Sequence, residues 1–267
     1  MSVNAAAELA EKNAFKKIRK LLGNPGVFAE PAGSEAGFPD FGFSVMINKR
    51  RIDLFFEYKA DHKAQMGSMR NWIFSSGKFT VPDADDENKK LLLEIMNGTP
   101  SAIREAKRLL KDFKTYFDKG VTEISSGMLS IISDKKMRKK KAALFASNTD
   151  NYQIANIEDA RLGKKIMDHY YKKFHKNQQA GSDGSILYMM MGDAIWHMES
   201  NGVTNAEEKF IAKLLGAGDI PALPDLVAKL ECRIQPRHTE LNKPAAARID
   251  VLAVFRLARR PSGGHTV

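Results

Sequence analysis

Residues 38–59, FPDFGFSVMINKRRIDLFFEYK, form two apolar segments joined by a polar turn. Aromatic and aliphatic residues dominate both segments, which predicts a β-hairpin with strands at Phe41–Ile47 and Ile52–Lys59. Side chains alternate between the two faces of a strand, so one face of the second strand is apolar and the other carries Asp53, Glu57 and Lys59. Because charge is costly to bury unless it is paired or binds a metal, the charged face indicates a functional site.

Three ionisable side chains of this hairpin are expected to converge. Asp40 begins the first strand directly after Pro39, and the turn brings it beside Glu57 and Lys59, which share a strand face because they lie two residues apart. Mg²⁺ is usually bound by one or two carboxylates together with waters and a substrate phosphate. Asp40 and Glu57 are therefore the expected Mg²⁺ ligands. Lys59 is expected to orient or activate the attacking water, or to stabilise the transition state, in phosphodiester hydrolysis.

The pattern Pro-Asp, 16 residues, Glu-Tyr-Lys resembles the motif of the PD-(D/E)xK nuclease superfamily, which includes most type II restriction endonucleases. Residues 57–67, EYKADHKAQMG, are also similar to the stretch after the catalytic triplet in the HhaI restriction endonuclease and its relatives. In those proteins, too, a histidine, a glutamine and a glycine follow the triplet. Residues 182–188, SDGSILY, and a basic C-terminal hairpin add to this looser similarity.

The resemblance implies a restriction-endonuclease-like core, in which a central mixed β-sheet is flanked by helices. It also implies Mg²⁺ as the cofactor and cleavage of double-stranded DNA to 5′-phosphate ends. In this superfamily an acid of the first helix often faces the metal site, and Glu8 and Glu11 are the two candidates. A cognate DNA methyltransferase is expected genetically, but not as a bound subunit. A palindromic recognition site would favour a homodimer by symmetry, although monomeric members exist.

The rest of the chain predicts an α/β protein with helical insertions. Periodic apolar positions predict helices at residues 4–22, 88–97, 101–118, 157–174 and 205–215. Residues 61–77 are expected to be a polar loop, and short strands are expected at residues 79–82, 128–132 and 186–191, the last extended through Trp196. A C-terminal β-hairpin is predicted at residues 226–234 and 248–257. No composition shift divides the chain, so one nuclease domain is expected over residues 1–258, followed by a disordered tail at residues 259–267.

Composition limits the partners and the compartment. Lys and Arg number 42 against 32 Asp and Glu, and the resulting net charge of +10 favours a polyanionic partner, nucleic acid or an acidic membrane surface. The single cysteine, Cys232, excludes a disulfide framework and a thiolate zinc site, and it fits a reducing cytoplasm. The sequence contains neither a membrane-spanning apolar run nor the features of a signal peptide, so a cytoplasmic protein without a membrane partner is expected.

Polar residues outside the catalytic strands are candidates for contacts with DNA. A first group follows the second strand on the predicted loop and consists of His62, Gln65, Ser68 and Arg70. A second group lies in a lysine-rich run and on the C-terminal hairpin, and it consists of Lys135, Lys139, Arg233, Gln235 and Arg237. A solvated loop, a solvated charge run and an edge strand kept soluble by charge are the alternative interpretations.

The catalytic interpretation competes with simpler ones. Asp40 can be an ordinary turn residue after proline, and Glu57 with Lys59 can be a surface ion pair worth under about 1 kcal/mol. Two other functions also stay open. One is a repair or recombination nuclease on the same fold, and the other is a non-catalytic basic protein that binds nucleic acid.

Asp53 is the competing carboxylate of the second strand. It lies four residues before Glu57, about 13 Å along a strand, so one metal ion cannot easily take both. Asp53 is instead expected to pair with Arg50 or Arg51 in the turn.

Overall fold

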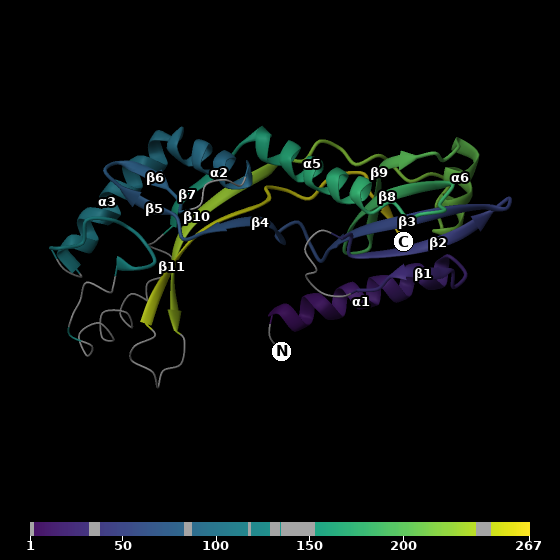
Figure 1. Ribbon diagram of the computed structural model, residues 1–267, viewed down its shortest axis with the longest axis horizontal. Coiled ribbons are helices and arrows are strands. Elements are labelled where there is room, and N and C mark those ends of the chain that lie inside the picture. Colours follow the sequence, from purple (N-terminus) through teal and green to yellow (C-terminus); the bar gives the residue numbers. More distant parts are fainter. Residues whose placement is uncertain are drawn as a thin grey trace. The chain divides into compact units, whose positions relative to one another are not determined.

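The computed structural model divides the chain into two compact units, each built from separated stretches of sequence (Figure 1). Unit 1 comprises Met1–Ala64, Gly163–Val227 and Leu257–Val267, and unit 2 comprises Gln65–Leu162 and Ala228–Arg256. The structure describes residues 3–31, 38–82, 87–116, 119–128, 134, 153–238 and 247–267. The sequence predicted one domain over residues 1–258. The sequence shows no domain boundary because the stretches that make up the two units alternate along the chain.

A six-stranded mixed sheet forms the centre of unit 1. Its strand order is β1-β2-β3-β8-β9-β12. The strands are β1 (Gly26–Ala29), β2 (Phe41–Ile47), β3 (Arg50–Lys59), β8 (Gly184–Met191), β9 (Ala194–Asn201) and β12 (His265–Thr266). Strands β3 and β8 pair in parallel, whereas the other neighbours pair antiparallel. The predicted α/β class with a mixed central sheet is therefore confirmed.

The predicted hairpin of β2 and β3 is present, and its turn explains its register. Asn48 and Lys49 have φ angles of 51° and 66°, the left-handed conformation that two-residue hairpin turns of type I′ require at both positions. Ile47 then pairs with Arg50, and the ladder continues to Phe41 opposite Phe56. This register brings the start of β2 beside the end of β3.

Helices cover both faces of this sheet (Figure 1). On one face, α1 (Val3–Leu21) packs Phe15 against Phe43 with ring centroids 5.1 Å apart, and α6 (Asn205–Leu214) joins the same core. On the other face, α5 (Ala160–Lys176) packs Phe174 edge-on against Phe55, with ring centroids 5.3 Å apart. Neighbouring side chains of β3 point to opposite faces, so this strand lies between α1 and α5.

Unit 2 contains a second sheet, of four strands in the order β4-β11-β10-β7. The strands are β4 (Gln65–Arg70), β11 (Ala247–Leu257), β10 (Ala228–His238) and β7 (Gln153–Glu158). Strands β10 and β11, at the positions predicted for a C-terminal β-hairpin, are neighbours in this sheet. A small hairpin of β5 (Ile73–Ser75) and β6 (Lys78–Thr80), with helices α2 (Glu87–Asn97) and α3 (Pro100–Tyr116), completes the described part of unit 2.

Several predicted elements differ from the structure. Residues 61–77, expected as a loop, contain β4 and β5, because β4 gains a partner in β11, far along the chain. The segment through Trp196 is a separate strand, β9, which returns antiparallel to β8 after a turn at Gly192, whose φ is 61°. The strand β7 was not predicted. The strand expected at residues 128–132 lies, except for its first residue, outside the described residues.

The tail predicted to be disordered, residues 259–267, packs against unit 1, so that prediction is wrong. Strand β12 pairs with β9, and the Val267 N–H donates to the carbonyl of Asp193 at 3.0 Å. The Trp196 indole N–H donates to the Ser262 carbonyl at 2.9 Å, and the Trp196 side chain is buried. The tail satisfies backbone groups that an edge strand would otherwise leave unpaired.

Candidate active site

The end of strand β3 gathers the three residues expected to be catalytic. Asp40 precedes β2, and its Oδ2 accepts a hydrogen bond of 2.7 Å from the Tyr58 N–H. The Lys59 Nζ lies 2.7 Å from Glu57 Oε1 and 3.5 Å from Asp40 Oδ2. Both carboxylates therefore approach one ammonium group. The structure brings Asp40, Glu57 and Lys59 together because the hairpin register places the start of β2 opposite the end of β3.

Helix α5 adds two residues that the sequence interpretation missed. Lys173 Nζ lies 2.8 Å from Glu57 Oε2, and the ammonium groups of Lys173 and Lys59 lie 5.7 Å and 5.8 Å from the centre of the Tyr170 ring. Tyr170 and Lys173 are one helical turn apart, so they share a face of α5. Phe174 anchors this turn over β3 through its contact with Phe55. No local sequence signal marks either residue, because their role depends on where α5 packs.

These contacts are buried, unlike those of a surface ion pair. The side chain of Glu57 is 4% exposed, that of Lys173 is 11% exposed and that of Lys59 is 16% exposed. A surface pair between Glu57 and Lys59, the simpler interpretation, does not fit this burial. A buried charge is tolerated where a partner compensates for its lost hydration. Here each oxygen of the Glu57 carboxylate has an ammonium partner.

The pKa shifts follow from burial and from these partners. Burial opposes the ionisation of Glu57, but Lys59 and Lys173 hold its pKa below its ordinary value. For Asp40, burial and the charge of Glu57 raise the pKa, against the opposing effect of Lys59. Burial alone would lower the pKa of Lys59, but Glu57, Tyr170 and Asp40 raise it well above its ordinary value. Lys59 is thus a protonated ammonium in this arrangement.

Glu11, one of the two first-helix acids, is half-buried and interacts electrostatically with Asp40, Lys59 and Glu57. Burial and the charges of Asp40 and Glu57 raise the pKa of Glu11 to about 7, against the opposing effect of Lys59. One carboxylate oxygen of Glu11, Oε1, is buried without a hydrogen-bond partner. Glu8, one turn earlier, is exposed. Glu11 is therefore the better candidate for the additional acid.

The raised pKa of Glu11 predicts a pH-dependent stability effect. The folded protein holds this proton up to about pH 7, whereas an unfolded chain loses it near the ordinary value, so stability falls as pH rises through this interval. We expect Glu11→Gln to raise Tm more at pH 8 than at pH 5. The difference should be about 2–4 °C, which corresponds to ~1 kcal/mol of unfolding free energy when solvent screening of this half-buried group is included. Thermal unfolding without divalent cations measures this, with Glu8→Gln as the control. An equal change at both pH values would contradict it.

The donor set suits a hard divalent cation in part. Among the described residues, no group of three His, Cys, Asp or Glu side chains is arranged to hold a metal ion. Asp40 and Glu57 supply two carboxylates, the number with which Mg²⁺ is commonly bound when waters and a substrate phosphate complete its shell. The buried Glu11 Oε1 has no hydrogen-bond partner, and Glu11 interacts electrostatically with Asp40, Lys59 and Glu57. If a Mg²⁺ ion bound here, Asp40 and Glu57 would be its protein ligands.

The expected DNA-contacting residues are spread over both units. His62 is half-buried in unit 1, in the turn after β3. Gln65, Ser68 and Arg70 lie on strand β4 of unit 2, where all three are exposed, rather than on a loop. Arg233 on β10 is half-buried, and its Nε has no hydrogen-bond partner. Lys135 and Lys139, and the side chains of Gln235 and Arg237, lie outside the part of the chain that the structure describes.

Asp53 lies outside the cluster, as expected. Its Oδ1 accepts hydrogen bonds from Ser44 Oγ at 2.5 Å and from Arg51 Nε at 3.0 Å, which confirms the predicted pairing with an arginine of the turn. The other turn arginine, Arg50, binds Glu207 of α6 through two hydrogen bonds. Both arginines of the turn therefore have structural partners.

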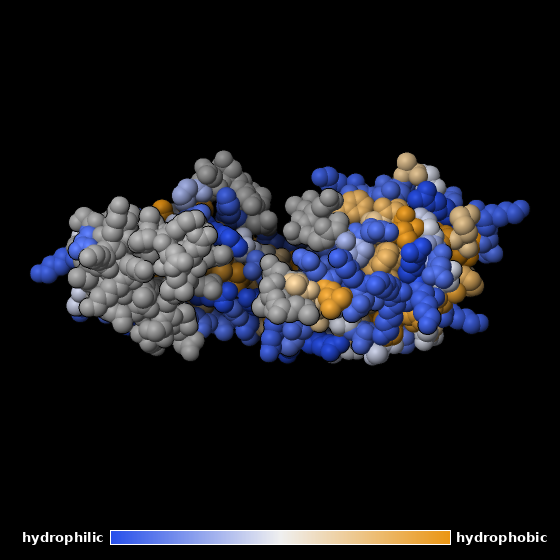
Figure 2. Space-filling view, turned by 90° about the horizontal axis from the view of Figure 1, so that it is seen from below, coloured by the Kyte–Doolittle hydropathy of each residue, from blue (hydrophilic) through white to orange (hydrophobic). Residues whose placement is uncertain are grey.

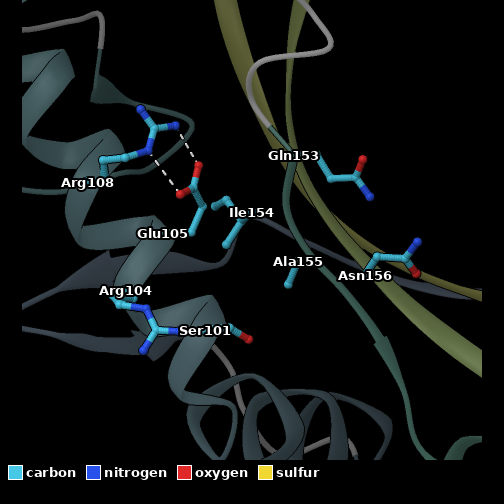
Figure 3. A pocket seen from close by; sticks show the side chains of 8 residues that line it. All are labelled: Ser101, Arg104, Glu105, Arg108, Gln153, Ile154, Ala155 and Asn156. Carbon is cyan, nitrogen blue, oxygen red and sulfur yellow. Dashed lines mark hydrogen bonds and ion pairs between the residues drawn. The ribbon is translucent and has the colours of Figure 1, made fainter.

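Unit 2 has a hollow of about 890 Å³ between α3 and β7 (Figure 3). Its lining mixes polar and apolar surface and comes from Ser101, Arg104, Glu105, Arg108, Gln153, Ile154, Ala155 and Asn156. The guanidinium of Arg108 binds Glu105 and Asp112, and Arg104 is the other arginine of the lining. The hollow lacks the buried, opposed charges that distinguish the end of β3.

The described surface in Figure 2 is mainly hydrophilic, and the chain has no match among known proteins in the three comparisons. Hydrophilic residues cover most of the coloured surface in Figure 2, with hydrophobic ones showing between them. In the described part of the chain, no helix is long and apolar enough to span a membrane. No protein-family model, no curated protein and no solved structure matches the chain.

Proposed function

We propose that the protein is a Mg²⁺-dependent, sequence-specific endonuclease of double-stranded DNA, of type II restriction character. The observation that carries this proposal is the cluster at the end of β3, where one ammonium, Lys59, lies 2.7 Å from Glu57 and 3.5 Å from Asp40. The mixed sheet with helices on both faces supports a restriction-endonuclease-like core, as the PD-(D/E)xK motif implies. Cleavage would leave 5′-phosphate ends.

Each residue of the cluster has a role that its position allows. Asp40 and Glu57 would hold Mg²⁺, which lowers the pKa of a bound water and neutralises charge on phosphate oxygens. Lys59 carries a proton, so it donates hydrogen bonds and can stabilise negative charge that develops on the scissile phosphate. The Tyr58 N–H holds the Asp40 carboxylate in place.

The charge of the two units suits a nucleic-acid substrate. Unit 2 contains 23 Lys and Arg against 16 Asp and Glu, whereas unit 1 contains 19 against 16. Most of the positive excess therefore lies in the unit that does not contain the cluster. Lysines and arginines bind the phosphate backbone of nucleic acid whatever its base sequence. The proposed reaction would instead use the carboxylates and the ammonium of the cluster in unit 1. We infer that unit 2 contributes to duplex binding.

Digestion of a mapped plasmid with Mg²⁺, and with EDTA as the control, tests the proposal. We expect discrete fragments with 5′-phosphate ends in Mg²⁺ and none in EDTA, because EDTA removes the divalent cation that Asp40 and Glu57 would hold. Sequencing of the ends then gives the recognition site. A smear, or a preference for branched DNA, would indicate a repair or recombination nuclease. Intact plasmid with retained binding would contradict the nuclease assignment.

A further inference from the structure

The Glu57 carboxylate has two ammonium partners, which differ in what else they contact. Lys59 on β3 lies 2.7 Å from Oε1 and also approaches Asp40. Lys173 on α5 lies 2.8 Å from Oε2, with Glu57 as its carboxylate partner. Both oxygens of a metal-ligand candidate are thus occupied by positive charge.

A purely structural role explains Lys173 poorly. Burying an ion pair costs desolvation that its attraction often fails to exceed, and apolar residues of similar volume commonly stabilise a fold as well. Glu57 already has one buried ammonium in Lys59. The second ammonium is explained by the neighbouring carboxylate, because Asp40 lies 3.5 Å from Lys59 and shares that ammonium with Glu57. A cation is needed there whenever Mg²⁺ is absent.

We propose that Lys173 is the counter-ion of Glu57 in the metal-free protein, and that it gives up Oε2 when a divalent cation binds. This inference rests on the proposed function, because it takes Asp40 and Glu57 as the ligands. An ammonium and a divalent cation repel each other, so they cannot both lie against one carboxylate oxygen without loss of affinity. The flexible four-carbon stem of a lysine allows the withdrawal without movement of α5.

The test measures cation binding in the absence of DNA. Mg²⁺ alone is titrated into metal-free wild type, Lys173→Met and Lys173→Gln, and binding is followed by calorimetry and by thermal shift. We expect both variants to bind Mg²⁺ at least about tenfold more tightly, since a competing positive charge has been removed. Lys173→Gln keeps a hydrogen-bond donor to Glu57 and serves where Lys173→Met does not fold. Lys173→Arg, which keeps the charge, should bind Mg²⁺ as the wild type does.

Stability supplies a readout that a merely structural lysine would not change. Without Mg²⁺, Lys173→Met should have a lower Tm than the wild type, and saturating Mg²⁺ should raise its Tm by more than that of the wild type. The exposed neighbour Lys172→Met is the matched control and should leave affinity and Tm unchanged. A structural role alone would lower Tm with no larger response to Mg²⁺, and that result would overturn the inference.

The outcomes separate this inference from the proposed function. If the wild type binds Mg²⁺ through Glu57 and the variants bind it no more tightly, the role of Lys173 as a counter-ion is refuted and the metal site stands. Binding through Glu57 is shown by its loss in Glu57→Gln. If neither the wild type nor the variants bind Mg²⁺ through Glu57, the metal assignment and this inference fall together.

Discussion

Replacement of Lys59 by Ala should lower the rate of DNA cleavage about 10³-fold and leave affinity for the duplex within a few-fold of the wild type. The large effect is expected because the Lys59 ammonium lies between the two carboxylates that would hold Mg²⁺, where charge develops during phosphodiester hydrolysis. Affinity changes little, since binding draws on many basic residues. Single-turnover cleavage and fluorescence anisotropy measure the two quantities separately.

The same variant must keep its fold for this comparison to hold. Lys173 still neutralises Glu57 when Lys59 is removed, so Lys59→Ala should fold and unfold cooperatively. Lys172→Ala, an exposed lysine on α5, is the control for the loss of one positive charge and should cleave at the wild-type rate. Cleavage by Lys59→Ala within tenfold of the wild type would show that the reaction takes place elsewhere.

Glu57→Gln should both abolish cleavage and destabilise unit 1 by about 3–5 kcal/mol, which corresponds to a fall in Tm on the order of 10 °C. The side chain of Glu57 is 4% exposed. Its replacement by the neutral glutamine leaves the ammonium groups of Lys59 and Lys173 without the carboxylate that they share. An unpaired buried charge costs far more than the net value of the original pair. Urea unfolding at pH 7 measures the free-energy difference.

An exposed ion pair of the same unit provides the matched control. Lys17 and Asp193 lie 2.8 Å apart but are 44% and 70% exposed, so Asp193→Asn should cost less than about 1 kcal/mol.

The effect of Glu57→Gln should also depend on pH in a defined direction. Because its partners lower the pKa of Glu57, the ionised pair stabilises the fold above the ordinary glutamate pKa and is lost as pH falls through the lowered value. Equal stability of Glu57→Gln and wild type at pH 7 would contradict the buried pair.

Local patterns were sufficient for the hairpin and for part of the candidate site. The alternation of β3 placed Glu57 and Lys59 on one face, and the residue after Pro39 supplied the partner at the start of β2. The same reasoning separated Asp53 from this group, and its contact with Arg51 agrees. These relations involve residues close in sequence, so periodicity and turn geometry determine them.

Elements that depend on distant partners were predicted less well. Strand β4 was taken for a polar loop because its partner, β11, lies almost two hundred residues further along the chain. Residues 259–267 were taken for a disordered tail because their polar composition does not show that the edge of β9 receives them. The two compact units are likewise built from segments of both halves of the chain, so no single stretch of sequence marks where one ends.

Sequence periodicity thus established the hairpin, the facing carboxylates and the adjacent lysine, because strand geometry acts over a few residues. Packing determined that Glu11 is half-buried whereas Glu8 is exposed, and that Lys173 reaches Glu57 across 116 residues of sequence. The position of α5 is set by the burial of Phe174 against Phe55 and by the rest of the apolar core. Hydrophobic burial is non-directional and sums over the whole unit, so no short pattern encodes which side chain of a helix meets a given carboxylate.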